Sequence, residues 1–123
     1  MTKDIIVGGK TVRMRATAAI PRLYRIKFRR DIMKDMQKLQ KAAGDTEEYT
    51  VDDLEMFENI AYIMAKHGDV DSDGNVIGNV PDSVEDWLDA FETFSIYEAL
   101  PQIIELWGMN IETESTSKKK QGK

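Results

Sequence analysis

The chain of 123 residues contains no cysteine, only three prolines and a single histidine. Without cysteine it has no disulfide, no thiolate nucleophile and no Cys-ligated zinc. It also lacks any apolar run close to the roughly 18 residues that a membrane-spanning helix needs. Its first residues, MTKDIIVGG, have neither the basic region nor the apolar core of a signal peptide. These absences favour a cytosolic protein with no membrane partner.

Charge is strongly polarised along the chain, although the net charge is only −5. Residues 1–43 carry twelve Lys and Arg against three Asp and Glu, a net charge of +9. Residues 44–111 carry one Lys against seventeen Asp and Glu, a net charge of −16, and residues 112–123 add +2. Such a chain can pair its halves internally or pair head to tail with copies of itself. The excess of negative charge argues against a general nucleic-acid-binding protein.

The sequence AAIPRLYRIKFRRDI at residues 18–32 predicts an amphipathic helix. Its apolar face consists of Ile20, Leu23, Tyr24 and Phe28. A cationic stripe on the opposite face consists of Arg22, Arg25 and Arg29. This stripe is either a solvated surface of a core helix or a surface that meets an acidic partner, and the sequence alone leaves both open. Thr17 is the expected N-cap.

The hydrophobic pattern changes phase after Phe28, so one straight helix would present two apolar faces. We therefore predict a break near Arg30, with Asp31 as the N-cap of a second helix. That helix should end at Gly44, the residue type that favours the position after a helix C-terminus. Three lysines, Lys34, Lys38 and Lys41, keep its outer face basic.

The remaining elements follow from turn and capping signals. Residues 3–16 predict a β-hairpin turned at Gly8-Gly9. A central helix should open at Thr50 to Asp53 and stop near Gly68, and two more should open at Ser83 and Ser95. The predicted fold class is α+β, mainly α, with an N-terminal β-hairpin followed by about five helices in a small bundle.

We expect one folded domain at residues 1–111, with helices from about 18 to 110. Pro101 lies inside the last helical segment and should kink or split it. Residues 112–123, ETESTSKKKQGK, contain no apolar side chain and predict a disordered tail.

The loop that follows the central helix resembles the first half of an EF-hand. Asp69, Asp71 and Asp73 occupy the first three ligand positions and Gly74 the sixth residue. The twelfth position, which should be a bidentate Glu, is Val80. We therefore favour an acidic, turn-rich loop and predict no resident metal, with the three aspartates as a weak candidate site for calcium.

No catalytic arrangement or cofactor site is evident, and we predict a protein that is not an enzyme. The single histidine, His67, lacks a recognisable catalytic partner, and its place at a helix C-terminus favours a protonated ring. Five aromatic residues crowd into the C-terminal third. They are either core residues or exposed partner contacts, and as candidate contacts we name Trp87, Phe91, Phe94, Tyr97 and Trp107.

Two blocks of the sequence support a family resemblance. The hairpin followed by ATAAIPRLYRIKFRRDIMKDMQKL, and the later DSVEDWLDAFETFSIYEALPQIIELWGMN, resemble the tail assembly chaperones of tailed phages and prophages of Gram-positive bacteria. The similarity covers about residues 3–110. The chain departs from the family pattern at Arg29, where a small residue such as glycine is expected, and in the loop at 71–80, which is longer than usual.

The resemblance implies a non-enzymatic role in the host bacterial cytoplasm. Such chaperones bind the tape measure protein, a long and mostly helical chain, and keep it soluble. They help to recruit tail tube subunits and leave before the mature virion forms. The competing hypothesis is a small nucleic-acid-binding regulatory protein that uses the stripe of Arg22, Arg25 and Arg29, although no helix-turn-helix pair is recognisable.

Covering a long partner also requires self-association, and the charge polarity supplies a candidate contact between copies. A basic face on one copy can meet acidic helices on the next, which builds a filament or an open helix. The candidate basic residues are Arg22, Arg25, Arg29, Lys34 and Lys38. The candidate acidic residues are Glu85, Asp86, Asp89 and Glu92.

Overall fold

A computed structural model describes residues 2–7, 9–45, 50–91 and 94–108. Strands β1 (Thr2–Val7) and β2 (Lys10–Arg15) form an antiparallel hairpin. The α-helices that follow include α1 (Ile20–Phe28), α2 (Ile32–Asp45), α3 (Val51–Gly68) and α4 (Val84–Asp89). The 3₁₀ helix η1 (Phe94–Ala99) then leads into a helix at residues 100–108. The predicted α+β, mainly α fold class is confirmed, while the predicted tail at 112–123 lies outside the described residues.

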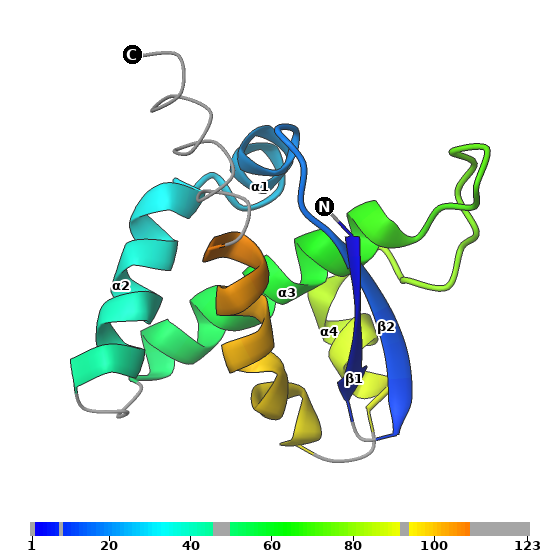
Figure 1. Cartoon of the computed structure of the whole chain (residues 1–123). Coiled ribbons are helices and arrows are strands. Elements are labelled where there is room, and N and C mark those ends of the chain that lie inside the picture. The colour runs from blue at the N-terminus through cyan, green and yellow to red at the C-terminus, as the bar shows by residue number, and fades with distance from the viewer. Residues whose placement is uncertain (1, 8, 46–49, 92–93, 109–123) are drawn as a thin grey trace, which may run out of the picture.

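Helix α3 is the central element, with the other elements arranged around it (Figure 1). It begins with the expected capping box, in which the Thr50 hydroxyl accepts from the Asp53 amide and the Asp53 carboxylate accepts from the Thr50 amide. Every residue from Ile60 to Ala65 is buried. A helix buried on consecutive residues is covered on all sides, so α3 has no solvated face over these six residues.

The C-terminal end of α3 lies directly on β2. A Cβ atom at Gly68 would come within 2.5 Å of the Arg13 carbonyl oxygen, so glycine permits this approach of helix to strand. The hairpin turns Ile5, Val7 and Met14 into the core, each at most 1% exposed. This in-and-out alternation is that of a half-buried strand.

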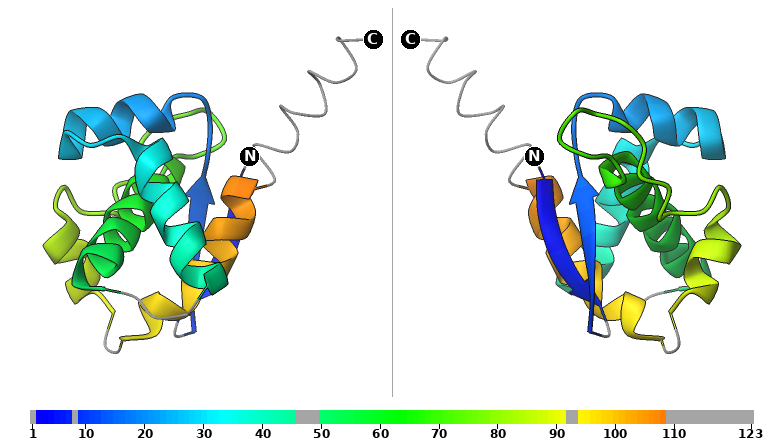
Figure 2. Two further views of the ribbon diagram at one scale, coloured as in Figure 1. Left: turned by 90° about the vertical axis from the view of Figure 1, so that its left-hand side faces the viewer. Right: turned by 90° about the vertical axis from the view of Figure 1, so that its right-hand side faces the viewer.

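Strand β1, at the start of the hairpin, lies beside the last helix that the structure describes. Figure 2 shows the helix at residues 100–108 beside β1, where the Lys3 ammonium lies 3.5 Å from the Glu105 carboxylate. Pro101 is the second residue of this helix, in the first turn, where no amide donor is needed. The segment is therefore split there into η1 and an α-helix, as predicted.

Three predicted helix boundaries are wrong. The last helical segment begins at Phe94, as the 3₁₀ helix η1, and not at Ser95. Helix α2 continues through Gly44 to Asp45, because interior glycine costs a helix only about 1 kcal/mol and α2 packs along α3. The N-cap of α1 is Ala19 rather than Thr17, whose hydroxyl instead accepts from the Ala19 amide in the turn before the helix.

The buried apolar side chains of the described residues form one cluster, to which the hairpin, helices α1 to α4 and the helix at residues 100–108 contribute. Its largest fully buried members include Tyr24, Tyr62, Phe57 and Met14. Among the described residues, no helix is both long enough and apolar enough to cross a membrane.

Candidate partner-binding surfaces

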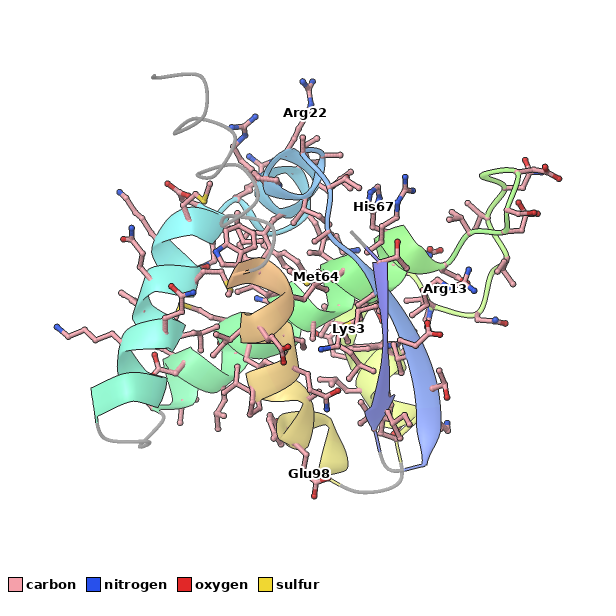
Figure 3. The ribbon with its side chains drawn as sticks, in the orientation of Figure 1. Lys3, Arg13, Arg22, Met64, His67 and Glu98 are labelled. Atoms are coloured by element: carbon pink, nitrogen blue, oxygen red, sulfur yellow. The ribbon has the colours of Figure 1, made fainter. Side chains whose placement is uncertain are left out.

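The five predicted basic residues lie on the outside of α1 and α2 and form what we call the basic surface. All are exposed, and none makes an ion pair with another residue that the structure describes. Figure 3 shows Arg22 pointing away from the body of the molecule. The members of the basic surface are Arg22, Arg25, Arg29, Lys34 and Lys38.

The break between α1 and α2 is present where the sequence predicts it. Arg29 ends α1 in the left-handed region, with φ 56°. The Asp31 carboxylate then caps α2 by accepting from the Met33 amide at 2.9 Å. The elbow between the helices is hollowed by a notch of about 710 Å³, beside which Ile26 is 64% exposed. The notch brings an apolar side chain next to Arg25 and Arg29.

A buried polar network locks this elbow from within. The Asp35 carboxylate, 3% exposed, accepts from the Tyr24 hydroxyl at 2.6 Å and from two guanidinium nitrogens of Arg30 at 2.8 and 2.9 Å. Burial opposes ionisation of Asp35, but the hydrogen bonds from Arg30 and Tyr24 outweigh it and hold the pKa of that carboxyl below its usual range. Arg30 is therefore a structural residue, whereas its neighbour Arg29 faces solvent.

The acidic residues of α4 form a second exposed surface. The Ser83 hydroxyl caps this helix by accepting from the Asp86 amide, and carboxylates in its first turn are favoured by the helix dipole. Glu85, Asp86 and Asp89 are exposed and define what we call the acidic surface. Glu92, the fourth predicted member, lies outside the described residues.

The interpretation of the aromatic residues as exposed partner contacts is wrong for both tryptophans. Trp87 and Trp107 are each 4% exposed, and Trp87 packs edge-on against Tyr62 and Phe91 at 5.8 and 5.3 Å between ring centroids. Both tryptophans lie on the apolar stripes of their helices, and these stripes face the core. Phe91 is half-buried, and the side chain of Phe94 is outside what the structure describes.

The fifth aromatic residue, Tyr97, is also half-buried and is tied to α3. Its hydroxyl donates to the Glu58 carboxylate. This hydrogen bond, together with burial, raises the pKa of Tyr97 to about 12. The hydroxyl therefore stays protonated at neutral pH and can remain the hydrogen-bond donor to the Glu58 carboxylate.

In the aspartate loop, the carboxylates of Asp69 and Asp71 accept hydrogen bonds from amides of the loop itself. The Asp69 carboxylate is 6% exposed and accepts from the Gly78 and Val80 amides at 3.2 and 2.8 Å. The Asp71 carboxylate accepts from the Asp73 and Asn75 amides, both at 2.9 Å. In the described part of the chain no group of three acidic or histidine side chains is placed to hold a metal ion. The candidate set of Asp69, Asp71 and Asp73 is thus not brought together around a cation.

His67 differs from the sequence expectation. Its Nε2 atom lies 2.8 Å from the Thr17 hydroxyl. Burial, followed by the positive charge of Arg15, lowers the pKa of the ring. The ring is therefore held neutral, and the prediction of a protonated histidine at the helix end is wrong because the environment outweighs the dipole.

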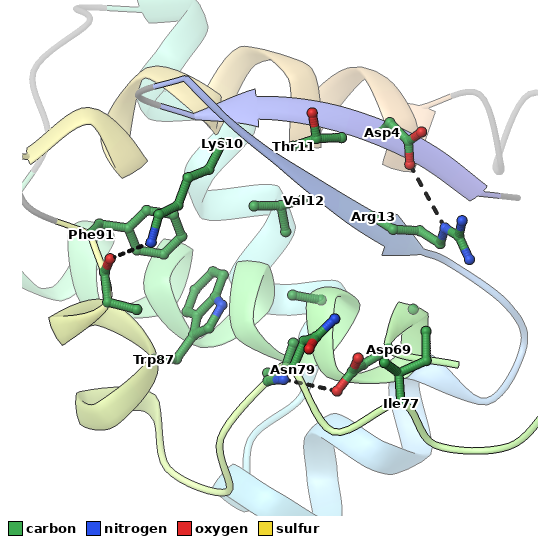
Figure 4. Close-up of a pocket in the computed structure, with 14 residues that line it drawn as sticks. Asp4, Lys10, Thr11, Val12, Arg13, Asp69, Ile77, Asn79, Trp87 and Phe91 are labelled. Atoms are coloured by element: carbon green, nitrogen blue, oxygen red, sulfur yellow. Dashed lines mark hydrogen bonds and ion pairs between the residues drawn. The ribbon is translucent and has the colours of Figure 1, made fainter. Parts of the chain in front are cut away.

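A hollow of about 390 Å³ lies between β2, the end of α3, the following loop and α4 (Figure 4). Several polar side chains of its rim are already engaged within the chain. The Lys10 ammonium donates to the Ala90 carbonyl at 2.7 Å and lies over the Phe91 ring, while Asp69 holds the loop amides. These side chains are therefore not free to converge on a ligand in the hollow.

A larger groove, of about 620 Å³, is one that the sequence did not indicate, and we call it the acid-rimmed groove. It lies where the end of α1, the first half of α3 and α4 meet. Its apolar lining is provided by Phe28, Val51, Leu54, Val84 and Leu88, and carboxylates of its rim come from Glu55 and Glu85. The sequence places most of these apolar residues on core-facing stripes, and only packing shows that they stay half-exposed.

Comparison of the chain with family models, with curated protein sequences and with solved structures gives no significant match.

Proposed function

We propose that this chain is a non-enzymatic assembly chaperone for phage tails. It binds the tape measure protein in the host cytoplasm, keeps it soluble and helps to recruit tail tube subunits. The resemblance of residues 3–110 to that family supplies the class of partner. The observation that carries the proposal is the separation of exposed charge: the basic surface on α1 and α2 makes no ion pair with a described residue, and an acidic surface lies on α4.

A chaperone that covers a long helix needs contacts with the partner and contacts between its own copies. Opposite charges on separate elements let the basic surface of one copy meet the acidic surface of the next. Because the two surfaces differ, the contact is heterologous and propagates into a filament or an open helix. Exposed charge also accelerates the encounter between copies, an effect that salt screens.

The test is co-expression with the tape measure protein, followed by measurement of its soluble fraction. We expect that fraction to rise when the full chain is present. It should fall again when the chain carries Arg22→Ala together with Arg25→Ala. The control is Arg22→Lys together with Arg25→Lys, which keeps the charge and should retain most of the effect. A tape measure protein that is equally insoluble with and without the full chain contradicts the proposal.

A further inference from the structure

We infer that the acid-rimmed groove is the docking site for an amphipathic helix whose apolar stripe is flanked by Lys and Arg. This inference rests on the proposed function, in which the chain covers helical segments of a partner. It adds where the helix binds and what chemistry the helix carries.

The groove offers an apolar surface that the chain leaves open. Val51, at the start of α3, is 81% exposed, and Leu54 and Leu88 beside it are half-buried. Apolar side chains from three helices thus line one concave surface. An amphipathic helix buries its apolar stripe in such a surface through residues spaced three and four apart.

The charge around the groove selects the flanks of that helix. Glu55 and Glu85 are exposed at the rim, and neither makes an ion pair with a described residue. Lys27, which also lines the groove, is engaged elsewhere, since its ammonium donates to the Asp82 carbonyl at 2.6 Å. Two free carboxylates beside an apolar floor favour cationic residues on both sides of an apolar stripe.

Two adjacent residues of α4 provide a matched pair of variants. Glu85 lines the groove and Asp86 does not, although both are exposed acidic residues in the first turn of the same helix. Glu85→Lys and Asp86→Lys therefore make the same change in charge with a similar cost to the helix dipole, and because both residues belong to the acidic surface, both weaken contacts between copies alike. Only the first of them alters the groove.

The experiment measures binding of two labelled helical peptides, each of about 18 residues, to the full chain by fluorescence anisotropy at low salt. One has a leucine stripe flanked by Lys, and the other has the same stripe flanked by Glu. We expect the Lys peptide to bind. Its affinity should fall about tenfold with Glu85→Lys and with Val51→Ser, and should change less than about twofold with Asp86→Lys.

Three results overturn the inference: no binding of the Lys peptide, equal binding of both peptides, or equal losses with Glu85→Lys and Asp86→Lys. A fourth is a change in the sedimentation of the protein alone on Val51→Ser, which assigns the groove to a second copy. Co-expression separates this inference from the proposed function. If the Lys peptide binds but the tape measure protein is not rescued, the groove is a docking site and the proposed function is rejected. If the tape measure protein is rescued but the Lys peptide does not bind, the proposed function stands and the docking site is rejected.

Discussion

Arg29 and Arg30 are neighbours in the chain but have different roles. Arg30 forms a bidentate pair with the buried Asp35 carboxylate. Arg29 stands in the left-handed backbone region, which costs a residue with a Cβ about 1 kcal/mol relative to glycine. A residue held in this region at an exposed position motivates a functional hypothesis, and here the hypothesis is that the Arg29 guanidinium takes part in the proposed partner contact.

Replacement of Arg29 by glycine should therefore stabilise the fold while removing part of the basic surface. We expect Arg29→Gly to raise the free energy of unfolding by up to about 1 kcal/mol, because the left-handed strain is relieved. The matched control Arg30→Gly should lower it, since Asp35 loses its cationic partner. Thermal unfolding followed by circular dichroism measures both. Equal losses of stability in the two variants would show that Arg29 and Arg30 contribute alike to the stability of the elbow.

His67 makes stability depend on pH near neutrality. Its pKa in the folded protein is lowered by burial and by Arg15, so the unfolded chain binds a proton that the folded chain rejects. This contribution to stability is fully present above the unfolded pKa of about 6.5 and decreases as pH falls through that value. We expect the melting temperature to drop between about pH 7.5 and pH 5.5.

The control for the histidine is His67→Gln, which removes the only side chain whose ordinary pKa lies in this window. Its melting temperature should be flatter over the same range. An identical slope in His67→Gln would attribute the pH dependence to other groups.

At the scale of elements, the α1–α2 elbow decides how the basic surface is presented. The two helices meet at an angle because the left-handed backbone of Arg29 turns the chain and the Asp31 carboxylate caps the start of α2. The hydrogen bond from Tyr24 of α1 to Asp35 of α2 then fixes the pair. Because the break brings both apolar faces onto α3, the cations of both helices point outward together.

Loss of the buried carboxylate should loosen this elbow. Asp35→Ala leaves the Tyr24 hydroxyl without its acceptor and Arg30 without its carboxylate. We expect a loss of about 2–3 kcal/mol, below the value for a fully buried pair because Arg30 is half-exposed. Tyr24→Phe should lose about 1 kcal/mol.

Urea denaturation measures these losses as shifts of the midpoint at an unchanged slope. Asp89→Ala is the control, because Asp89 is an exposed residue at the end of α4 and its loss should matter by less than about 0.5 kcal/mol. A loss for Asp35→Ala no larger than that of the control would mean that the network does not hold the elbow.

For the whole molecule, separated charge predicts self-association that salt weakens. Sedimentation velocity from about 50 mM to about 1 M NaCl should show large species at low salt and smaller ones at high salt. Assembly that persists unchanged at the highest salt concentration would contradict a contact led by charge.

A mixing experiment tests the polarity of that contact. One variant carries Arg22→Ala with Arg25→Ala, and the other carries Asp86→Ala with Asp89→Ala. Each alone should lose the large species. Mixed together they retain one intact contact, so we expect pairs and nothing larger, as a heterologous interface requires. Restoration of the large species would instead indicate a different interface.

Local signals in the sequence account for most of the elements. Short-range chemistry accounts for the hairpin, the break after Phe28, the capping box at Thr50 and the start of α4 at Ser83. It does not account for the end of α2, because an interior glycine costs a helix only about 1 kcal/mol, which is too little to stop it at Gly44. Nor does it account for the start of α1, because Ala19 and not Thr17 is its N-cap.

The sequence by itself determined the polarity of charge and the elements that carry it, because formal charge and amphipathic periodicity belong to the residues. Only the tertiary structure decided which side chains remain open. It buried Trp87 and Trp107 and kept His67 neutral. It paired Arg30 with the Asp35 carboxylate and left Arg29 exposed to solvent. It also assembled the acid-rimmed groove from α1, α3 and α4, since the exposure of a side chain depends on what packs across from it and not on its neighbours in the chain.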